Sequence, residues 1–536
     1  MKLLGNNKFF KHLKIIQMKK INIIIVSFAL LNLVFSCTPD LINKSPLDAI
    51  SPATFYQDGA QSKIALMGVY NSIVPRDVPT QFYQFDFMSD NDYCQDGWQG
   101  SKEFGDWVQN SSSWAAGALW SFGYRGIVRS NSFLTNVDKA TMSETVRTQM
   151  KAEARFIRAY MYFTLISYYG DVPLVPEVQS TTNSQIARTP KAQVLDAIIA
   201  DLTFAAANLP TTYSGGDVGR ATKGAALAFK AKALLYNEKW ADAAQATQEV
   251  INLGTYSLYP NYATLFDESN ENNVEVIFDI QYIKNTFAQS WPGSCTSFTQ
   301  WSTANATSDL INSYYTTNGL PITNAASGYN EQDPYTNRDP RLAASVVLPG
   351  SSFVNGITFL PASTGNSYLG ARPRKYADLY NTNPGNCAIN TILMRYADVL
   401  LMRAEALIES GSTSSEIYTL IDKVRARVNM PTVESVEGTG LTQTQLRAIL
   451  RHERRVEFFI EGTRYADMLR WKDASLVHDV YGYDLSKLTN PASATTWTFS
   501  QIKYAGRTFD SSKGFLWPIP HNEMQVNKLL TQNPGY

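Results

Sequence analysis

The chain has 536 residues, 44% of them hydrophobic and 18% charged, with 47 basic and 47 acidic side chains. This composition predicts a large folded protein and argues against extended disorder. The four Cys and four His residues are scattered, without C-x-x-C spacing, so neither a disulfide framework nor a zinc or His-based catalytic centre is indicated.

The N-terminal segment has the order of a secretory signal. The basic pair Lys19-Lys20 precedes an apolar run, 21–35, and a small residue precedes Cys37. A Cys at this point resembles the lipobox of bacterial lipoproteins, in which it is lipidated and becomes the first mature residue. We therefore predict a signal peptide over residues 1–36, with Met18 as an alternative start. A plain secretory signal and a membrane anchor are the alternatives, although the run is shorter than the ~20 residues of a spanning helix.

Removal of the signal peptide changes the charge balance. Residues 1–36 hold six Lys and no acid, which leaves 41 of the 47 basic residues against 47 acidic ones. The mature chain is therefore mildly acidic. A nucleic-acid partner, which requires a basic surface, is not expected.

Apolar residues at helical spacing predict most of the secondary structure. Thr189-Pro190 has the pattern of a helix start, and Gly170, Gly254 and Gly411 stand where helices should end. The predicted helices cover residues 151–169, 223–236, 240–253, 393–410, 415–428 and 442–471.

Two of these segments form helix pairs with a shared pattern. Residues 225–236 are followed by a second helix that opens on Trp240, and residues 396–409 are followed by 417–428. Small Ala residues at the crossing points resemble tetratricopeptide repeats, which must stack to bury their faces. The expected fold is mainly α, with helix pairs that form a curved scaffold packed against a loop-rich lobe with a few short strands.

The loop-rich lobe is expected from residues 255–387, which are rich in Asn, Ser, Thr, Gly and aromatic residues. Only short runs, 274–280 and 344–348, read as strands. Residues 81–120 have the same texture and hold Trp98, Trp107, Trp114 and Trp120. Because long irregular segments of a folded protein usually carry function, we expect a binding site there.

Five sequence blocks, in order, resemble the SusD/RagB family of Bacteroidota outer-membrane lipoproteins. Together they span nearly the whole mature chain. The blocks are Ala152-Glu-Ala-Arg-Phe-Ile-Arg-Ala-Tyr-Met-Tyr-Phe with Tyr169-Gly-Asp-Val-Pro-Leu; Asp339-Pro-Arg-Leu; Arg395-Tyr-Ala-Asp-Val-Leu-Leu-Met-Arg-Ala-Glu-Ala; Arg451-His-Glu-Arg-Arg-Val-Glu-Phe with Glu461-Gly-Thr-Arg-Tyr-Ala-Asp-Met-Leu-Arg-Trp; and Trp517-Pro-Ile-Pro with Gln532-Asn-Pro-Gly-Tyr536.

The resemblance implies a lipid-anchored protein on the outer face of the outer membrane. Such proteins capture a nutrient, usually an oligosaccharide or glycan, and deliver it to a TonB-dependent SusC-like transporter. Peptide capture is the alternative within the family. The resemblance also implies an N-terminal SusD-like part, 37–254, and a C-terminal part, 255–536, that contains the ligand lobe.

The family block 451–470 reads as scaffold. Its acids Glu453, Glu457 and Glu461 recur every four residues, which allows ion pairs along one helix and with bases on the next. Charge ladders of this kind are commonplace on helices, so we predict no catalytic role for them.

The segment around Trp98 is the first candidate ligand site. Sugars stack their C–H faces on aromatic rings, and polar side chains fix their hydroxyls by hydrogen bonds. Asn91 and Asp92 supply such polar groups close to Trp98. Asp90, Asp92 and Asp96 sparsely resemble a calcium loop but lack its regular alternation and closing Glu, so no metal or other cofactor is assigned.

A second candidate site comprises Trp291 and Trp301, which lie in polar stretches of the other irregular segment. The two segments could face each other across a shallow cleft. Tyr83 and Arg372 are further candidates, and the neighbouring Arg374 has at least an equal claim to a structural role.

Two other classes of function compete with capture. A surface glycosidase would need two carboxylates at a set separation, and these are too plentiful to exclude it. However, the sequence has no H-E-x-x-H, G-x-S-x-G, phosphate-loop or dinucleotide motif, and we predict that the protein is not an enzyme. A pure assembly protein would bury Trp98 and Trp291 or place them in a partner contact.

Overall fold

The computed structural model describes residues 55–75, 82–95, 97, 100–180, 183–289, 295–301, 303–359, 369–483 and 501–536. The predicted signal peptide, 1–36, and Cys37 lie outside these residues. Within the described part of the chain, no helix is long and apolar enough to cross a membrane.

The fold is mainly α, as predicted. The helices are α3 (Gly59–Tyr70), α4 (Ser101–Gly105), α5 (Trp114–Asn136), α6 (Glu144–Tyr169), α7 (Lys191–Asn208), α8 (Lys223–Tyr236), α9 (Trp240–Asn252), α10 (Cys295–Trp301), α11 (Ser308–Ser313), α12 (Pro340–Ser345), α13 (Tyr396–Glu409), α14 (Ser415–Ala426), α15 (Val433–Glu437), α16 (Gln443–Glu457), α17 (Arg464–Trp471) and α18 (His521–Val526).

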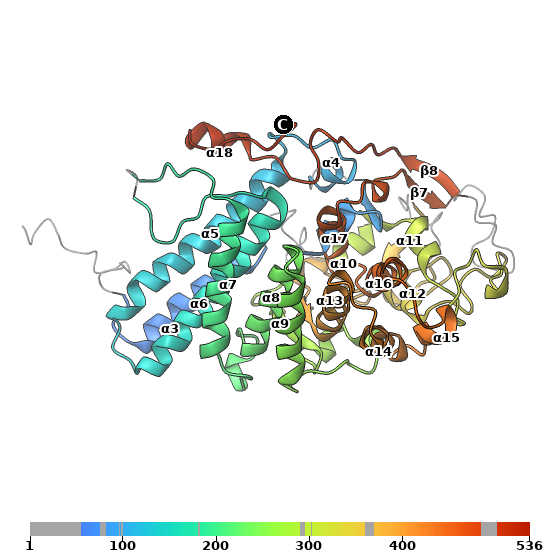
Figure 1. Cartoon of the computed structure of the whole chain (residues 1–536), viewed down its shortest axis with the longest axis horizontal. Helices are drawn as coiled ribbons and strands as arrows, with labels where there is room; N and C mark the ends of the chain where they lie inside the picture. Colours follow the sequence, from blue (N-terminus) through green and yellow to red (C-terminus); the bar gives the residue numbers. More distant parts are fainter. Residues whose placement is uncertain are drawn as a thin grey trace, which may run out of the picture.

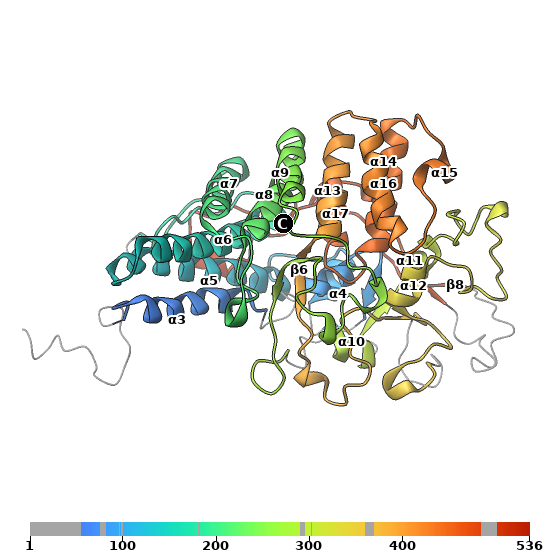
Figure 2. The same cartoon turned by 90° about the horizontal axis from the view of Figure 1, so that it is seen from below.

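The helices stack pair against pair. Helix α5 packs on α6, α6 on α7, α7 on α8 and α8 on α9, and then α13 of the second predicted pair packs on α9 although some 140 residues of chain separate them. The two predicted repeats, α8/α9 and α13/α14, are thus neighbours in one scaffold. Figure 1 shows this row of helices, and Figure 2 shows the loop-rich lobe beneath its C-terminal half.

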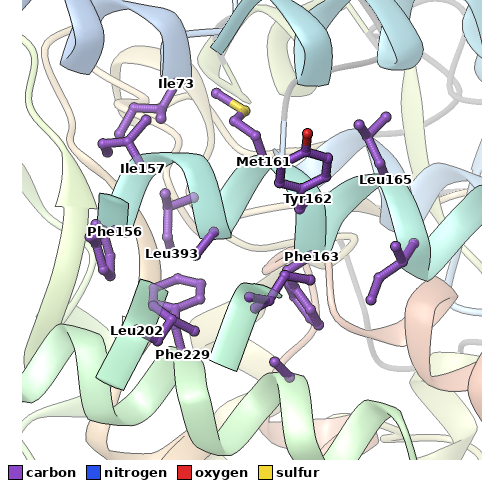
Figure 3. Close-up of a cluster of buried hydrophobic side chains, with 14 of the residues drawn as sticks. Ile73, Phe156, Ile157, Met161, Tyr162, Phe163, Leu165, Leu202, Phe229 and Leu393 are labelled. Atoms are coloured by element: carbon purple, nitrogen blue, oxygen red, sulfur yellow. The ribbon is translucent and has the colours of Figure 1, made fainter. Parts of the chain in front are cut away.

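The main core is built around α6. Its residues Phe156, Ile157 and Met161 are completely buried, and Phe229 of α8 and Phe278 of the loop-rich lobe pack edge-to-face on Phe156. Figure 3 shows side chains from several elements converging on this helix. The helix is apolar on more than one side because it has neighbours on both, α5 and α7.

Among the residues that the structure describes, the strands of the loop-rich lobe form two-stranded antiparallel ladders. They are β1 (Asp92–Cys94) with β3 (Ala304–Ala306), β2 (Val276–Ile280) with β6 (Thr391–Arg395), β4 (Val346–Val347) with β5 (Arg372–Pro373), and β7 (Val480–Tyr483) with β8 (Gln501–Ala505). The first two ladders join segments far apart in sequence, whereas β4–β5 and β7–β8 each close a shorter loop. The ladders therefore fix the loops that lie between them.

Helix α6 begins seven residues before the predicted 151, and two other predicted helices differ more substantially from the observed ones. The start of the predicted helix 393–410 belongs to β6, and α13 begins only at Tyr396. The predicted helix 442–471 is divided into α16 and α17. Ile460 and Gly462 adopt left-handed φ values of 61° and 68° between these helices, a conformation that an α-helix does not accommodate.

Helix α5 lies partly in a segment expected to be irregular. Residues 81–120 were predicted as loop, yet Trp114 opens a helix of 23 residues. Three Gly residues in α5 lower its intrinsic helix propensity, and packing against α6 compensates. Two of these, Gly123 and Gly126, let the helices approach closely, since an added Cβ would lie 2.6 Å from Leu165 and 2.5 Å from Met161.

The family motifs meet in one buried charge network. Glu453, Glu457 and Glu461 are at most 4% exposed. Two partners come from other motif segments, namely Arg341 at 2.6 Å from Glu453 and Arg395 at 2.7 Å from Glu457, and Lys375 lies 2.8 Å from Glu461. The acidic stripe thus pairs with bases on neighbouring elements, as expected for scaffold.

The spacing of three residues would also allow Arg454 to pair with Glu457 and Glu461 with Arg464 along one continuous helix, but neither pair forms. Arg454 pairs with Asp398 of α13 and Asp467 of α17, and Arg464 pairs with Asp90. The break between α16 and α17 changes the direction of the chain, so spacing of three residues no longer places Glu461 beside Arg464.

Candidate ligand-binding site

The β1–β3 ladder brings the two candidate segments together. Cys94 of β1 lies opposite Ala304 of β3 in antiparallel register. At that end of the ladder the chain continues from β1 towards residue 98, and β3 begins shortly after Trp301. Trp98, Trp291 and the side chain of Tyr83 themselves lie outside what the structure describes; the backbone of residue 83 is part of a short 3₁₀ helix, Phe82–Met88.

Asn91 and Asp92 hold this ladder in place. Both side chains are fully buried. Asp92 Oδ1 accepts a hydrogen bond from the Asn305 backbone N–H at 3.1 Å, and Asn91 Oδ1 accepts one from Arg455 Nε at 2.7 Å. Because buried side chains with protein partners do not reach a surface ligand, we leave both residues out of the proposed site. Their polar atoms satisfy a buried backbone N–H of Asn305 and the guanidinium group of Arg455.

Asp90 and Asp92 of the sparse calcium-like pattern are also bound by the protein, and Asp96 lies outside the described residues. Arg464 forms two hydrogen bonds of 2.7 Å with the Asp90 carboxylate, and Arg455 bridges Asp90 and Asp309. Burial alone would raise the pKa of Asp90, but these two guanidinium groups lower it below its usual range. His478 lies 3.8 Å from Asp309. Two arginines already supply the positive charge that a cation would bring to this cluster.

Trp301 is presented to solvent by α10. The residue is 51% exposed at the C-terminal end of this short helix. Thr299 Oγ1 donates to the Pro373 carbonyl at 2.8 Å, and Gln300 Nε2 donates to the Asn381 carbonyl at 2.9 Å. These bonds fix the helix to segment 372–381. An exposed indole on a fixed helix end is well suited to stack on a ligand.

Arg372 positions α10 from below. The residue is 1% exposed, and Nη1 donates to the carbonyls of Thr299 and Gln300 at 2.9 and 3.0 Å. These belong to the last helical turn, whose carbonyls have no partner within the helix. Burial lowers the pKa of Arg372 to about 10. The structure therefore places this predicted ligand residue behind the site, where it supports Trp301.

Segment 372–381 carries a second exposed aromatic residue and a cleft. Tyr380 is 70% exposed and lines a cavity of about 430 Å³ together with Arg374, Asp267 and Asp378. The Tyr380 backbone N–H donates to Asp378 Oδ1 at 3.1 Å, which stabilises the turn. The Asp378 backbone N–H in turn donates to Thr296 Oγ1 of α10 at 2.9 Å. Trp301 and the cleft therefore belong to one hydrogen-bonded unit.

Tyr380, Asp378 and Asp267 are candidate site residues that sequence reasoning did not single out. They stand in the loop-rich stretch 255–387 that was expected to carry function, but nothing in their local sequence separates them from its other polar residues. The remaining Trp residues of the first candidate segment divide by burial. Trp107 and Trp120 are 5% and 4% exposed and belong to the core, whereas Trp114 is 49% exposed.

The arrangement is suited to binding a polyhydroxylated ligand. It combines aromatic faces at Trp301 and Tyr380 with carboxylate, guanidinium and amide groups in the same unit. Sugars require this combination because their rings have apolar C–H faces and polar edges.

Family models, related sequences and solved structures match this chain, and each group includes members described as SusD or SusD-like. Residues 265–536 match the family model described as the SusD family, and residues 50–235 match a model described as starch-binding associating with outer membrane. A SusD-like protein of Formosa agariphila is 27% identical over 97% of this chain and 100% of its own. Two solved structures from Bacteroides fragilis, a SusD-like protein and a SusD-like carbohydrate binding protein, are each 28% identical, cover 92% and 89% of this chain and 100% of their own, and have TM-scores of 0.80 and 0.79.

Proposed function

Because the chain belongs to the SusD family, we propose that it is a non-catalytic protein that captures an oligosaccharide or glycan at the outer cell surface and delivers it to a SusC-like TonB-dependent transporter. The single observation that carries this proposal is the exposed indole of Trp301 on a helix end fixed by Arg372. When a sugar ring covers an exposed indole, the apolar surface of the indole is removed from water, and this removal favours binding.

The rest of the site supports a sugar ligand. Tyr380 supplies a second aromatic face, and Arg374, Asp267 and Asp378 supply donors and acceptors around the cleft. The ladder register further favours a contribution from Trp98, because its segment leaves β1 beside the segment of Trp301. We propose Trp98 and Trp291 as additional contacts and Tyr83 as a peripheral one.

The family and the N-terminal signal support the proposed delivery and location. One matched family model is described as associating with outer membrane. Lipidation of Cys37 would tether the binding lobe to that membrane, which raises its effective concentration near a transporter. A stable complex with a large β-barrel should then be recovered from gently solubilised membranes, whereas isolation of a lone lipoprotein under the same conditions would contradict the partner.

Titration of the purified protein with soluble polysaccharides and with peptides tests the ligand class. We expect Trp301→Ala to weaken binding of the recognised glycan by tenfold or more, as expected for loss of a central aromatic contact. Ile64→Ala is the control, because Ile64 is an exposed apolar residue of α3 that lines neither α10 nor the cleft. Equal loss in both variants, or binding of peptides alone, would contradict glycan capture. Release of sugar products at an enzymatic rate would contradict a non-catalytic role.

A further inference from the structure

A second cavity lies apart from the Trp301 surface. It has a volume of about 590 Å³ and lies where α7 and the α8–α9 turn meet α17 and the C-terminal segment. Leu195, Leu469 and Phe515 contribute apolar walls. Its volume falls in the range of small-molecule sites, and it shares no lining residue with the cleft beside Tyr380. Figure 1 shows these elements in the middle of the helical row.

Lysines from three separate segments line this cavity. Lys191 is the first residue of α7, Lys239 lies in the α8–α9 turn and Lys472 directly follows α17. Lys472 Nζ forms an ion pair of 3.2 Å with Glu238. The fourth cationic group on the wall, Arg470, is already committed, because its guanidinium donates to both carboxylate oxygens of Glu405 at 2.6 and 2.7 Å.

Lys191 is half-buried, and its ammonium group has no ion pair with any residue that the structure describes. The acids near it are Glu238, which pairs with Lys472, and Asp171, whose Oδ1 accepts the backbone N–H of Lys191 at 2.7 Å. Burial, together with the positive charge of Lys472, lowers the pKa of Lys191. An ammonium group in this position is stabilised when an anion enters the cavity.

The backbone at the rim is also unusual. Glu238 and Lys472 have left-handed φ values of 61° and 53°. Gly or Asn normally occupies such positions, because a longer side chain costs about 1 kcal/mol there. Here both positions carry charged side chains that meet across the rim. The ion pair holds Lys472 on the wall of the cavity.

We propose that this cavity binds a small organic carboxylate, with the carboxylate between Lys191 and Lys472 and the body of the ligand on Leu469 and Phe515. The shared chemistry is that of a sugar acid or of the C-terminus of a short peptide. This second site is independent of the proposed glycan capture at Trp301.

Isothermal titration of the purified protein with matched probe pairs tests the proposal. The pairs are glucuronate with glucose, and an N-acetylated dipeptide acid with its C-terminal amide. We expect one acid to bind and its neutral counterpart to bind at least about tenfold more weakly, because only the acid forms charge-assisted hydrogen bonds with the lysines. The acid that binds identifies the source of the carboxylate. Binding of neither acid, or equal binding of both members of each pair, would overturn the proposal.

Lys191→Met provides the variant, since it keeps most of the aliphatic stem and removes the charge. It should weaken binding of the acid about tenfold, while Lys423→Met, an exposed lysine of α14, should leave it unchanged. The thermal unfolding midpoint of Lys191→Met should equal or exceed that of the wild type, because an unpaired half-buried charge is removed. Unchanged affinity in Lys191→Met would refute the site. Trp301→Ala should retain acid binding, which separates this proposal from glycan capture.

Discussion

Glu457 lies at the centre of the buried charge network. Its carboxylate accepts hydrogen bonds from Arg341, Arg395 and Arg427. Burial alone would raise its pKa, but these cations hold the pKa of Glu457 well below its usual range. Glu457→Gln would leave the guanidinium groups short of one anion in a site closed to water. We expect it to lower the free energy of unfolding by about 3 kcal/mol, measured by urea denaturation.

The control for this prediction is Glu437→Gln on the exposed end of α15. A solvated carboxylate contributes little, so its loss should change the unfolding free energy by less than about 0.5 kcal/mol. Similar effects of the two substitutions would contradict this prediction, because the buried Glu457 would then contribute no more to stability than an exposed carboxylate.

His452 predicts a pH dependence of stability. Its Nε2 lies 2.8 Å from the Ser313 carbonyl, its ring stacks on Tyr315 at 3.9 Å, and burial lowers its pKa to about 4. An unfolded chain binds a proton at a His pKa of about 6.5, so between these values it holds more protons than the folded chain. The contribution of neutral His452 is therefore complete above pH 6.5 and is lost as the pH falls towards 4.

Urea denaturation of the wild type and of His452→Gln at pH 7.5, 6, 5 and 4.5 tests this dependence. Carboxylates titrate in the same window, but their contribution is common to both proteins and cancels in the difference. We expect the difference between the two unfolding free energies to shrink by up to about 3 kcal/mol towards the lowest pH. Parallel pH profiles would mean that His452 does not titrate between folded and unfolded states.

At the scale of elements, the contact between α5 and α6 depends on small residues. A Cβ at Gly123 would lie 2.6 Å from Leu165 Cγ, whereas a Cβ at Gly117 of the same helix would meet no atom within 4 Å. Gly123→Ala should therefore destabilise the protein by about 1–3 kcal/mol through overpacking. Gly117→Ala should stabilise it by about 0.5–1 kcal/mol through helix propensity. Thermal unfolding of both variants measures these opposite changes in stability. Stabilisation by both substitutions would mean that α6 moves away without a cost in free energy.

The helices that the sequence predicted well are those whose apolar period is regular. Residues 223–236 match α8, which is buried almost all round, and 240–253 exceed by one residue α9, which buries one face. The break between α16 and α17 was missed, since a left-handed residue such as Ile460 leaves no mark on apolar spacing. Helix α5 was missed because its Gly residues, which propensity counts against a helix, are there for packing on α6.

The candidate site could be predicted only in outline. Residue types directed attention to Trp301, which is exposed, but equally to Asn91, Asp92 and Arg372, which are buried. Composition does not separate a polar side chain that meets a ligand from one that fixes a buried backbone, because both need the same donors and acceptors. That distinction depends on long-range contacts such as the β1–β3 ladder and the bonds between α10 and segment 372–381.

At the scale of the whole molecule, the binding lobe and the start of the described chain lie at opposite ends. Figures 1 and 2 both show α3 at one extreme of the long axis and the lobe that carries α10, α11 and β8 towards the other. A lipid at Cys37 would attach the molecule through the part of the chain that precedes α3.

The anchor itself is tested by Cys37→Ser in the full chain. If Cys37 is lipidated, the wild type should fractionate with the outer membrane and the variant should be released, because its apolar run 21–35 is removed with the signal or is too short to span. The released protein should bind glycan as the wild type does, while uptake by cells should fall. Release that leaves uptake intact would contradict the tether. Retention of the variant in the membrane would instead favour the uncleaved segment as the anchor, since fractionation would then be independent of the thiol.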